Sequence, residues 1–496
     1  MEVKVSYKKF CLTLLTILFV ISVFHIGESF SQDIPKNIIL MISDGCGHNH
    51  INATSLYQYG NTGTQVYEKF PIQLWVSTYS ARNLKVSVPY KEGYEPEKAW
   101  SWFEYVKSGA TDSGAAATAM ATGFKTYNSA IGVDVDKNAL KNISEHAKER
   151  GKSAGVVTSV QFSHATPACF VAHNPGRGKY EEIAQEMLLD SKMDVIMGCG
   201  NPLYDNDGNP VSDKRNYSFV GGELVWNGLM KGQIEFDLDK DGINDNFIED
   251  CDGDGFRDPW TLIQDLSDFR SLMDGETPKR VLGIPKVYET LQCRRSPFTD
   301  RNFDGKKDTK DAVLADDIYK DPFNPNVPSL QEMVSGAINV LDNNNKGFFL
   351  MIEGGAIDWA SHSNVFARMI EEEIEFNKAV EAVVKWIETK SSWNETLLIV
   401  TGDHETGYLT GPNSGPDKDD PNDSIKPVWN PLINNGKGKF PGYEWHSTSH
   451  TNSLVPIYAK GAGSDLLKKY ADELDPVRGA YIDNTEIAKV MFELWK

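Results

Sequence analysis

Acidic and histidine side chains recur in this chain at the ends of short apolar runs. Asp44 follows the run 37–43, Glu353 follows 347–352, and Asp403 follows 396–401. Together with nearby residues they make one set of candidate metal ligands: Asp44, Glu353, Asp358, His362, Asp403, His404 and His450. Histidine and aspartate without cysteine suit zinc in a hydrolytic site that keeps positions open for water or substrate.

The spacing within residues 353–362 supports this interpretation. Asp358 and His362 are four residues apart, so a short helix would present both side chains on one face. Any one of these histidines alone would more often be structural. Their common position near strand ends favours a shared metal site, because ligands of open α/β sheets bind beyond the carboxyl ends of the strands.

Ser113 is the candidate nucleophile. It follows Asp112 and opens the Ala-rich, strongly helical run 113–120. A helix N-terminus offers unpaired N–H groups and a positive potential, which suit a phosphate group and a serine oxygen that must lose its proton. An ordinary N-cap explains the same residues and is the stronger explanation for this motif alone. Ser113 does not lie in a GxSxG motif, but a metal can activate a serine in place of a histidine base.

The elements that must position these residues alternate along the chain. Apolar runs predict buried strands at 37–43, 154–158, 194–197, 347–352 and 396–401. Helical patterns lie between them at 139–150, 180–189, 330–341 and 367–389. Continuous apolar strands that alternate with helices predict an α/β fold with a mainly parallel central sheet flanked by helices.

Two stretches depart from this alternation. Residues 201–327 are rich in Asp, Asn, Gly and Pro and have weak periodicity. We interpret them as a large insertion within the catalytic domain, not as a separate terminal domain. Residues 411–443 resemble a long surface loop, and loops of that length are usually functional or mobile.

The insertion repeats one acidic pattern three times. Each copy has Asp or Asn at alternate positions, then a glycine, then another Asp: Asp237, Asp239, Asp241 and Asp245; Asp250, Asp252, Asp254 and Asp258; Asp300, Asn302, Asp304 and Asp308. A chain that turns at the glycine would direct these oxygens at one hard cation, as in the first part of an EF-hand calcium loop. The usual glutamate at the twelfth position is missing, and a solvated acidic loop is the alternative. Calcium is therefore a candidate ligand of the insertion.

The N-terminus predicts export. Three lysines among the first nine residues precede the apolar run 10–24, and small residues follow up to Ser31. This is the pattern of a cleaved signal peptide over residues 1–31. An uncleaved membrane anchor is the alternative, although the run is short for a span of about 20 residues. We expect the mature chain, 32–496, to be soluble in the periplasm or outside the cell.

Charge and cysteine content narrow the function further. The 496-residue chain has a formal net charge of −20, which argues against a nucleic-acid-binding surface. A phosphate site in such a chain must supply its positive charge locally, through metals or an arginine. Five cysteines follow residue 31 and no CxxC is present. We therefore predict neither a zinc–sulfur site nor a disulfide framework, although one bridge would be compatible with the sequence.

Together these motifs resemble those of the alkaline phosphatases. The matching segments are Ser43-Asp44-Gly45-x-Gly47, Thr111-Asp112-Ser113-Gly-Ala-Ala, Ser163-His164-Ala165-Thr166-Pro167-Ala168, Glu353-x4-Asp358-x3-His362, Thr401-Gly402-Asp403-His404 and His450-Thr451. They are spread over residues 37–463 in the family's order and spacing. The resemblance implies the family's α/β fold and a phosphoric monoester hydrolase that forms a phosphoserine intermediate.

The resemblance also implies roles for individual residues. The zinc ligands would form two groups, Asp358, His362 and His450 for the first ion and Asp44, Asp403 and His404 for the second, close to the Ser113 oxygen. Asp44 would also bridge to a magnesium ion held by Thr166 and Glu353. Arg177, at the family's offset from the Thr166 motif, would clamp the phosphate oxygens. The residues that border the substrate would be Asp112, Ser113, Arg177 and Trp359.

Two positions depart from the best-studied bacterial enzymes of this family. His164 stands where they have Asp, and Trp359 stands where they have Lys. Neither neutral group repeats the acid–base pair that contacts phosphate through water. His164 could become a direct ligand of the third metal, which would then be zinc or weakly held magnesium. Loss of the Lys is expected to weaken binding of the phosphate product.

Other activities fit fewer of these residues. A phosphodiesterase or nucleotide pyrophosphatase of the same superfamily shares the two-zinc core but generally lacks the third metal site, so Thr166 with Glu353 favours monoesters. A sulfatase would need a Cys-x-Pro-x-Arg segment, which the chain lacks. A calcium-binding surface protein with a vestigial metal site is disfavoured, because no expected ligand is missing. The motifs leave open the natural substrate and the choice between monomer and homodimer.

Overall fold

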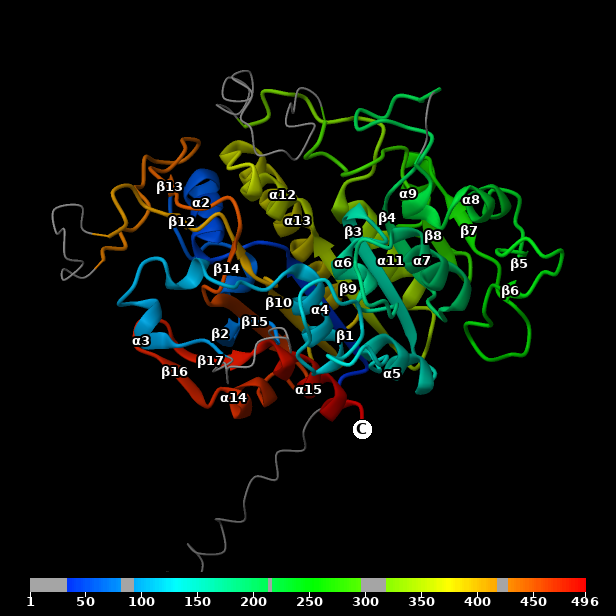
Figure 1. Ribbon diagram of the computed structural model, residues 1–496, viewed down its shortest axis with the longest axis horizontal. Helices are drawn as coiled ribbons and strands as arrows, with labels where there is room; N and C mark the ends of the chain where they lie inside the picture. Colours follow the sequence, from blue (N-terminus) through cyan, green and yellow to red (C-terminus); the bar gives the residue numbers. More distant parts are fainter. Residues whose placement is uncertain (1–33, 82–92, 213–215, 296–317, 417–426) are drawn as a thin grey trace, which may run out of the picture. The chain divides into compact units, whose positions relative to one another are not determined.

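An eleven-stranded, mainly parallel sheet runs through the described part of the chain (Figure 1). The computed structural model describes residues 34–81, 93–212, 216–295, 318–416 and 427–496. The middle of the sheet consists of parallel neighbours in the order β10 (Thr396–Thr401), β1 (Asn37–Ser43), β9 (Phe348–Gly354) and β3 (Ser153–Gln161). This arrangement confirms the predicted α/β class and the strands expected in these four regions.

The sheet continues on both sides of this middle. Beyond β3 lie three more parallel strands, β4 (Val195–Cys199), β8 (Val281–Gly283) and β7 (Thr261–Ile263). Beyond β10 lie β15 (Val455–Gly461), β2 (Ile72–Ser77), β17 (Gly479–Asp483) and β16 (Glu473–Asp475). Antiparallel pairs occur on this second side, where β15 pairs with both β10 and β2. The sheet is therefore parallel where the candidate ligands follow its strands.

The segment 201–327 is more regular than its composition predicts. It supplies β7 and β8 to the edge of the main sheet, and it forms α8 (Glu223–Leu229), α9 (Leu266–Ser271) and a small pair made of β5 (Glu235–Phe236) and β6 (Asn246–Phe247). Strands of two or three residues are too short to leave a periodic pattern in a sequence. This explains why the segment has weak periodicity in the sequence although it contains short strands and helices.

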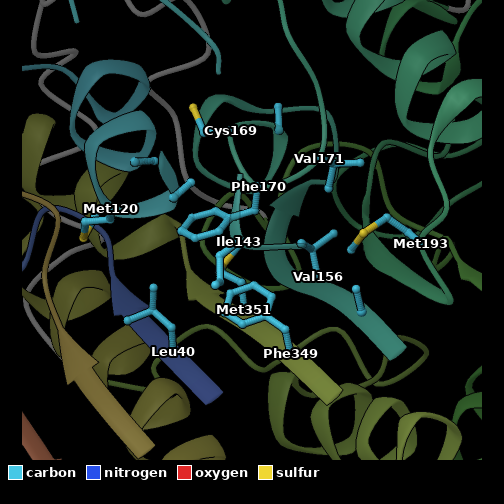
Figure 2. Packing of buried hydrophobic residues seen from close by; sticks show 14 of the residues in the cluster. Leu40, Met120, Ile143, Val156, Cys169, Phe170, Val171, Met193, Phe349 and Met351 are labelled. Carbon is cyan, nitrogen blue, oxygen red and sulfur yellow. The ribbon is translucent and has the colours of Figure 1, made fainter. Parts of the chain in front are cut away.

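Side chains of β1 alternate between two apolar layers. Ile38, Leu40 and Ile42 join one buried cluster, and Ile39 and Met41 join the other. Helices that contribute to the first cluster are α4 (Ser113–Thr122), α5 (Ile143–Glu149), α7 (Tyr180–Gln185) and α15 (Asn484–Leu494). Those of the second are α2 (His48–Tyr59), α11 (Leu330–Leu341), α12 (Ala356–His362) and α13 (Phe366–Lys390). Figure 2 shows Leu40 of β1 within the first cluster. Burial on both faces explains why these strands read as continuous apolar runs.

The predicted helices are found with shifted ends. The pattern 330–341 is α11, 367–389 lies within α13, and 180–189 is α7 followed by a π-helical turn, Glu186–Asp190. The helix expected at 139–150 begins only at Ile143. Asn142 is its N-cap and accepts a hydrogen bond from the Glu145 N–H at 3.0 Å, so the helix ladder starts at the cap.

Some predictions concern residues outside this description. The predicted signal peptide and the third acidic repeat, 300–308, both lie outside the described residues. Among the described residues, no helix is both long and apolar enough to cross a membrane. Cys46, Cys169, Cys199, Cys251 and Cys293 are buried and unpaired.

Candidate functional site

Three acidic residues meet where β10, β1 and β9 end. Ile42 of β1 is in register with Thr401 on one side and with Glu353 on the other. This register brings Asp44, Glu353 and Asp403 to the same edge of the sheet, and each is at most 2% exposed. The strand-end argument predicted this meeting, because parallel neighbours finish at one edge.

A first group of ligands forms around Asp358. Asp358 and His362 lie on one face of α12, as their spacing predicts. His450 arrives on β14 (His450–Thr451), which pairs with β11 (Glu405–Thr406). The Nε2 atoms of His362 and His450 are 2.9 Å apart, and each lies 3.4 Å from a carboxylate oxygen of Asp358. These three side chains therefore converge on one point.

Backbone carbonyls decide which ring nitrogen faces that point. The Nδ1 atom of His362 lies 2.6 Å from the Thr448 carbonyl oxygen, and the Nδ1 atom of His450 lies 2.8 Å from that of Thr111. A proton on each Nδ1 would leave both Nε2 lone pairs directed at Asp358, the usual arrangement of metal-binding histidines. Burial lowers the pKa of His450, but the Asp358 carboxylate outweighs it and raises that pKa to about 9.

A second group adjoins the first through His404. Its Nε2 atom lies 3.2 Å from an oxygen of Asp403 and 3.6 Å from one of Asp44. The other oxygen of Asp403 accepts hydrogen bonds from the N–H groups of Gly45 at 3.1 Å and His404 at 2.9 Å. The His404 ring stacks on His450 with ring centres 3.7 Å apart. The two ligand groups are thus parts of one continuous cluster.

Several interior acceptors of this cluster lack a protein partner. The atoms Asp44 Oδ1, Glu353 Oε1 and Asp403 Oδ2 are buried and receive no hydrogen bond from the described residues. Burial raises the pKa of Glu353 and that of Asp403 to about 7, and burial with the nearby Asp403 charge raises the pKa of Asp44. Buried charges are costly unless they are paired or coordinate a metal. The donor set, carboxylates with imidazoles, fits divalent metal ions.

The residues predicted for the third metal lie beside the second group. Thr166, in the short helix α6 (Ala165–Ala168), donates its hydroxyl to Asp44 Oδ2 at 3.3 Å. Glu353 accepts a short hydrogen bond from Thr158, its register partner on β3. Possible ligand atoms come close together in two groups, one of Asp358, His404 and His450 and the other of Asp44, Asp403 and His404. Glu353 and His164 belong to neither group. Burial, then Arg177, lowers the pKa of His164 to about 3, so its ring is neutral.

Ser113 is the first residue of α4 and faces the ligands. The N-cap is Asp112, whose Oδ1 accepts the Ala115 N–H at 3.0 Å. The hydroxyl oxygen of Ser113 lies 3.3 Å from Nε2 of His404, and the residue is 2% exposed. The capping explanation of the motif therefore applies to Asp112, while Ser113 is directed into the cluster at the positive end of a helix.

Arg177 is held in place by Asp112. Its Nη1 donates to Asp112 Oδ2 at 2.8 Å. Burial alone would raise the pKa of Asp112, but the Arg177 charge and the N–H groups of Ala115 and Ser129 outweigh it and hold that pKa below its usual value. Arg177 and Ser113 line the same cavity, so the guanidinium stands where an anion bound at Ser113 would meet it.

That cavity has a volume of about 410 Å³. Predicted residues in its lining are Ser113, His164, Arg177, Asp358, Trp359, His362 and His450. Sequence reasoning missed the others: Gln161, Tyr180, Phe219, Tyr288 and Glu289. Three of these five come from the segment 201–327, where no motif marks them. A larger cavity of about 620 Å³ lies beside Trp100 and Trp429, and none of the predicted site residues lines it.

Two threonines that support the ligands were also missed. Thr406 donates its hydroxyl to Asp358 Oδ1 at 2.6 Å, and Thr158 donates to Glu353. Thr406 stands two residues after His404, on a strand of two residues that the sequence did not reveal. Its proximity to the Asp403-His404 pair was the only signal available.

The first two acidic repeats form exposed loops. Each turns at a glycine of positive φ, Gly242 at 94° and Gly255 at 90°. The first Asp of each loop accepts the N–H of that glycine, Asp237 at 2.9 Å and Asp250 at 2.7 Å. Carboxylate oxygens of Asp237, Asp239 and Asp241 lie within 4.8 Å of one another, as do those of Asp250, Asp252 and Asp254. In the second loop, Lys279 bridges Asp252, Asp254 and Asp258.

Comparisons with known proteins show which family the chain matches. The family model described as alkaline phosphatase matches residues 35–426. The chain is 26% identical to alkaline phosphatase 4 of Bacillus subtilis (strain 168), over 93% of this chain and 89% of that protein. It is 27% identical to the alkaline phosphatase of Escherichia coli (strain K12), over 90% of this chain and 86% of that protein.

A solved structure shows the same fold. A mutant of the alkaline phosphatase from bacterium TAB5, with a histidine replaced by glutamate and Mg bound in its M3 site, superposes with a TM-score of 0.56. The two chains are 24% identical, and the match covers 93% of this chain and 98% of the other.

Proposed function

Since the chain belongs to the alkaline phosphatase family, we propose that it hydrolyses phosphate monoesters to an alcohol and inorganic phosphate through a phosphoserine at Ser113. The observation that carries this proposal is the contact between Ser113 Oγ and His404 within the buried ligand cluster. A serine at a helix N-terminus, beside acids and imidazoles and facing an arginine, is equipped to attack phosphorus.

The proposal assigns the metals as follows. Asp358, His362 and His450 would hold one zinc ion, and Asp44, Asp403 and His404 a second. When bound, such ions lower the pKa of a coordinated oxygen and stabilise charge on the attacking and leaving oxygens. The unpartnered oxygens of Asp44 and Asp403 support this assignment, because a cation would satisfy both.

The chain's own residues would then carry out two displacements. Arg177, oriented by Asp112, clamps the phosphoryl oxygens and neutralises their charge. The Ser113 hydroxyl gives up its proton, and Oγ attacks phosphorus in line with the ester bond, which breaks; the leaving oxygen takes up a proton and departs as the alcohol. Water next attacks the phosphoserine, the Ser113 Oγ–P bond breaks, and inorganic phosphate leaves. The α4 N-terminus stabilises negative charge in both steps.

A third ion, magnesium or zinc, would be held by Asp44, Thr166 and Glu353. The hydrogen bond from Thr166 to Asp44 supports this grouping. The TAB5 mutant binds Mg in its M3 site when a histidine is replaced by glutamate. By analogy, the neutral His164 beside this group would favour zinc over magnesium, since imidazole is a softer ligand than carboxylate.

We further propose that the protein is exported by a signal peptide within residues 1–31 and acts in the periplasm or outside the cell. The three lysines and the apolar run 10–24 support this location. Secreted or periplasmic, the enzyme would act on small phosphate monoesters. Both a monomer and a homodimer are compatible with the site, since all its proposed residues come from one chain.

The decisive experiment compares p-nitrophenyl phosphate with its bis-ester. We expect the parent protein to prefer the monoester and Ser113→Ala to lose turnover by at least about a thousandfold. Trapping at acid pH should label Ser113 of the parent with phosphate. Preference for the bis-ester would overturn the monoesterase proposal in favour of a phosphodiesterase or nucleotide pyrophosphatase. Full activity of Ser113→Ala would show that Ser113 is not the nucleophile.

Trp359 allows a second test. It takes the position of a lysine in the best-studied bacterial relatives, and its neutral ring offers no charge to phosphate. Trp359→Lys is therefore expected to lower the inhibition constant of inorganic phosphate by about tenfold, the effect of one charge-assisted contact. An unchanged or higher inhibition constant would contradict this role.

A further inference from the structure

One wall of the cavity over Ser113 is built of aromatic rings. Tyr180, Phe219, Tyr288 and Trp359 line it, in the same cavity as Ser113 and Arg177. Phe219 and Tyr288 both come from the segment 201–327, which thereby reaches the candidate site. At about 410 Å³ the cavity is larger than a phosphate needs and falls in the size range of small-molecule pockets.

The rings follow one another along this wall. The Trp359 and His164 rings lie 5.4 Å apart, and His164 stacks on Tyr180 at 6.0 Å. Tyr180 and Phe219 are 4.6 Å apart, and Phe219 and Tyr288 are 5.8 Å apart. Tyr180, Phe219 and Tyr288 are each partly exposed, so they present ring surface to the cavity. A planar group could stack on this surface.

Two hydrogen-bond acceptors accompany the rings. Gln161 lines the cavity at 2% exposure, and its side-chain oxygen Oε1 receives no hydrogen bond from the described residues. Glu289 lines the cavity next to Tyr288, with its side chain 25% exposed. Asn206 donates to Glu289 Oε2 at 2.8 Å and so fixes the carboxylate. An amide oxygen and a carboxylate in this position select a ligand that donates hydrogen bonds.

We infer that this wall binds the leaving group and selects phosphate esters of neutral, planar heteroaromatic alcohols that donate hydrogen bonds, of which nucleosides are the biological class. The inference rests on the proposed monoesterase function and adds a substrate class to it. The base would stack on Phe219 and Tyr288 and donate to Glu289 or Gln161. Arg294 Nε lies 3.9 Å from Glu289 Oε2 and offsets part of its charge. The remaining negative charge of Glu289 would disfavour anionic leaving groups, because like charges repel across a partly dehydrated cavity.

The test compares two esters of primary alcohols, adenosine 5′-monophosphate and sn-glycerol 3-phosphate. Their leaving alkoxides are chemically similar, so a difference in kcat/KM reports on recognition. We expect the parent to favour the nucleotide by on the order of tenfold, the size of one stacking contact. Phe219→Ala and Tyr288→Ala should each bring the ratio close to one. Phe256→Ala, at a 75% exposed ring of the same segment, is the matched control and should keep the parent's ratio.

Glu289→Gln separates charge from stacking. This variant keeps the shape of the side chain, and we expect the rate ratio of 3-phosphoglycerate, an anionic ester, to glycerol phosphate to rise about tenfold. Thermal unfolding checks that each variant is folded. The proposed binding of the leaving group by the aromatic wall would be wrong if the parent's ratio of kcat/KM for the nucleotide and glycerol phosphate were near one. It would also be wrong if that ratio were unchanged in both Phe219→Ala and Tyr288→Ala. Either result would leave the monoesterase function intact.

A direct binding measurement makes the two proposals separable. Free adenosine is expected to bind the parent in calorimetry and to bind Phe219→Ala about tenfold more weakly. This readout does not need turnover. If the protein hydrolysed neither ester, the proposed function would fail, and adenosine binding would still decide the role of the wall. Equal binding of adenosine to the parent and to Phe219→Ala would overturn it.

Discussion

The molecule contains two kinds of acidic region that look alike in the sequence and differ in the fold. Asp44, Glu353 and Asp403 lie at the ends of buried strands, and each keeps an oxygen that receives no hydrogen bond from the part of the chain that the structure describes. Among the described acids of the first two repeats, all but the buried Asp258 lie in exposed loops, where backbone N–H groups satisfy the first Asp of each loop. Buried acids without a partner are therefore costly, whereas exposed acids are stable in water.

Lys279 adds a second difference between the loops and the interior cluster. Its ammonium group lies 2.6 Å from Asp252 and 2.6 Å from Asp258, so the second loop carries its own counter-charge. The interior cluster has Arg177 nearby, but that guanidinium is bound to Asp112. The interior acids therefore have more to gain from a bound cation than the loop acids, which lie in water or beside Lys279.

Metal removal is expected to show the largest difference between the interior cluster and the acidic loops. A chelator should lower hydrolysis of p-nitrophenyl phosphate by at least about a thousandfold, because the interior cluster supplies the proposed catalytic ions. Steady-state rates before and after zinc and magnesium are restored provide the measurement. Asp241→Asn, in the first loop, should hydrolyse p-nitrophenyl phosphate at the parent's rate when metals are present. After chelation it should lose activity to the same extent as the parent. Full activity after thorough stripping would contradict the metal mechanism.

Thr406→Val tests the support of the interior ligands. Loss of the hydroxyl that donates to Asp358 should raise the zinc concentration for half-maximal activity about 10–100-fold, as expected when the second layer around a metal is lost. Titration of the stripped protein with zinc measures this. Thr389→Val is the control, since that hydroxyl donates to the Lys385 carbonyl oxygen within its own helix. An unchanged zinc requirement would show that the hydrogen bond does not position Asp358.

Glu372 tests how burial affects a carboxyl group that lies outside the candidate metal site. Burial raises its pKa to about 8, above the ordinary 4.5, although Arg295 opposes the shift. Between these values the folded state binds a proton that the unfolded state does not, so stability falls as pH rises through this window. Glu372→Gln cannot titrate and should lose less stability from pH 5 to pH 8. We expect the two unfolding free energies to diverge by on the order of 2–4 kcal/mol at pH 8.

Denaturant unfolding at several pH values measures this divergence. Asp239→Asn, in the exposed first loop, should show the pH dependence of the parent. Parallel stability curves for the parent and Glu372→Gln would mean that Glu372 is ionised in the folded protein at no cost.

Calcium should give the smallest effect. A loop site with a dissociation constant of about 10⁻⁴–10⁻³ M would raise the melting temperature by about 1–3 °C at 10 mM calcium. Lys279→Met removes the competing ammonium group and should enlarge the shift. Asp237→Asn with Asp250→Asn should abolish it. An identical melting temperature in calcium and in chelator, for the parent and for Lys279→Met, would leave the loops as solvated acidic turns.

Much of the candidate site could be predicted because its residues directly follow apolar runs or have helical spacing. Asp44 and Asp403 each follow a continuous apolar run, and Asp358 and His362 have helical spacing. The supporting hydroxyls were not predictable in this way. Thr406 lies on a strand of two residues, and Thr158 is one of several polar residues within β3, so only the register with Glu353 singles it out.

The insertion shows the same limit at larger scale. Its acidic repeats were visible because they are local, and the structure has their turns at Gly242 and Gly255. Its contribution to the main sheet was not visible, since β7 and β8 have three residues each. Phe219, Tyr288 and Glu289 likewise carry no local signature, and they reach the cavity only because the chain between β4 and β9 folds back over it.

The sequence by itself determined the α/β class, the family and the set of candidate ligands, because apolar periodicity and residue spacing are properties of neighbouring residues. Only the tertiary structure decided how these parts meet. Parallel register brought Asp44, Glu353 and Asp403 to one edge, and the pairing of β11 with β14 stacked His404 on His450. Contacts of this kind join residues far apart in the chain, and burial, which separates the interior acids from those of the loops, exists only once the chain has folded.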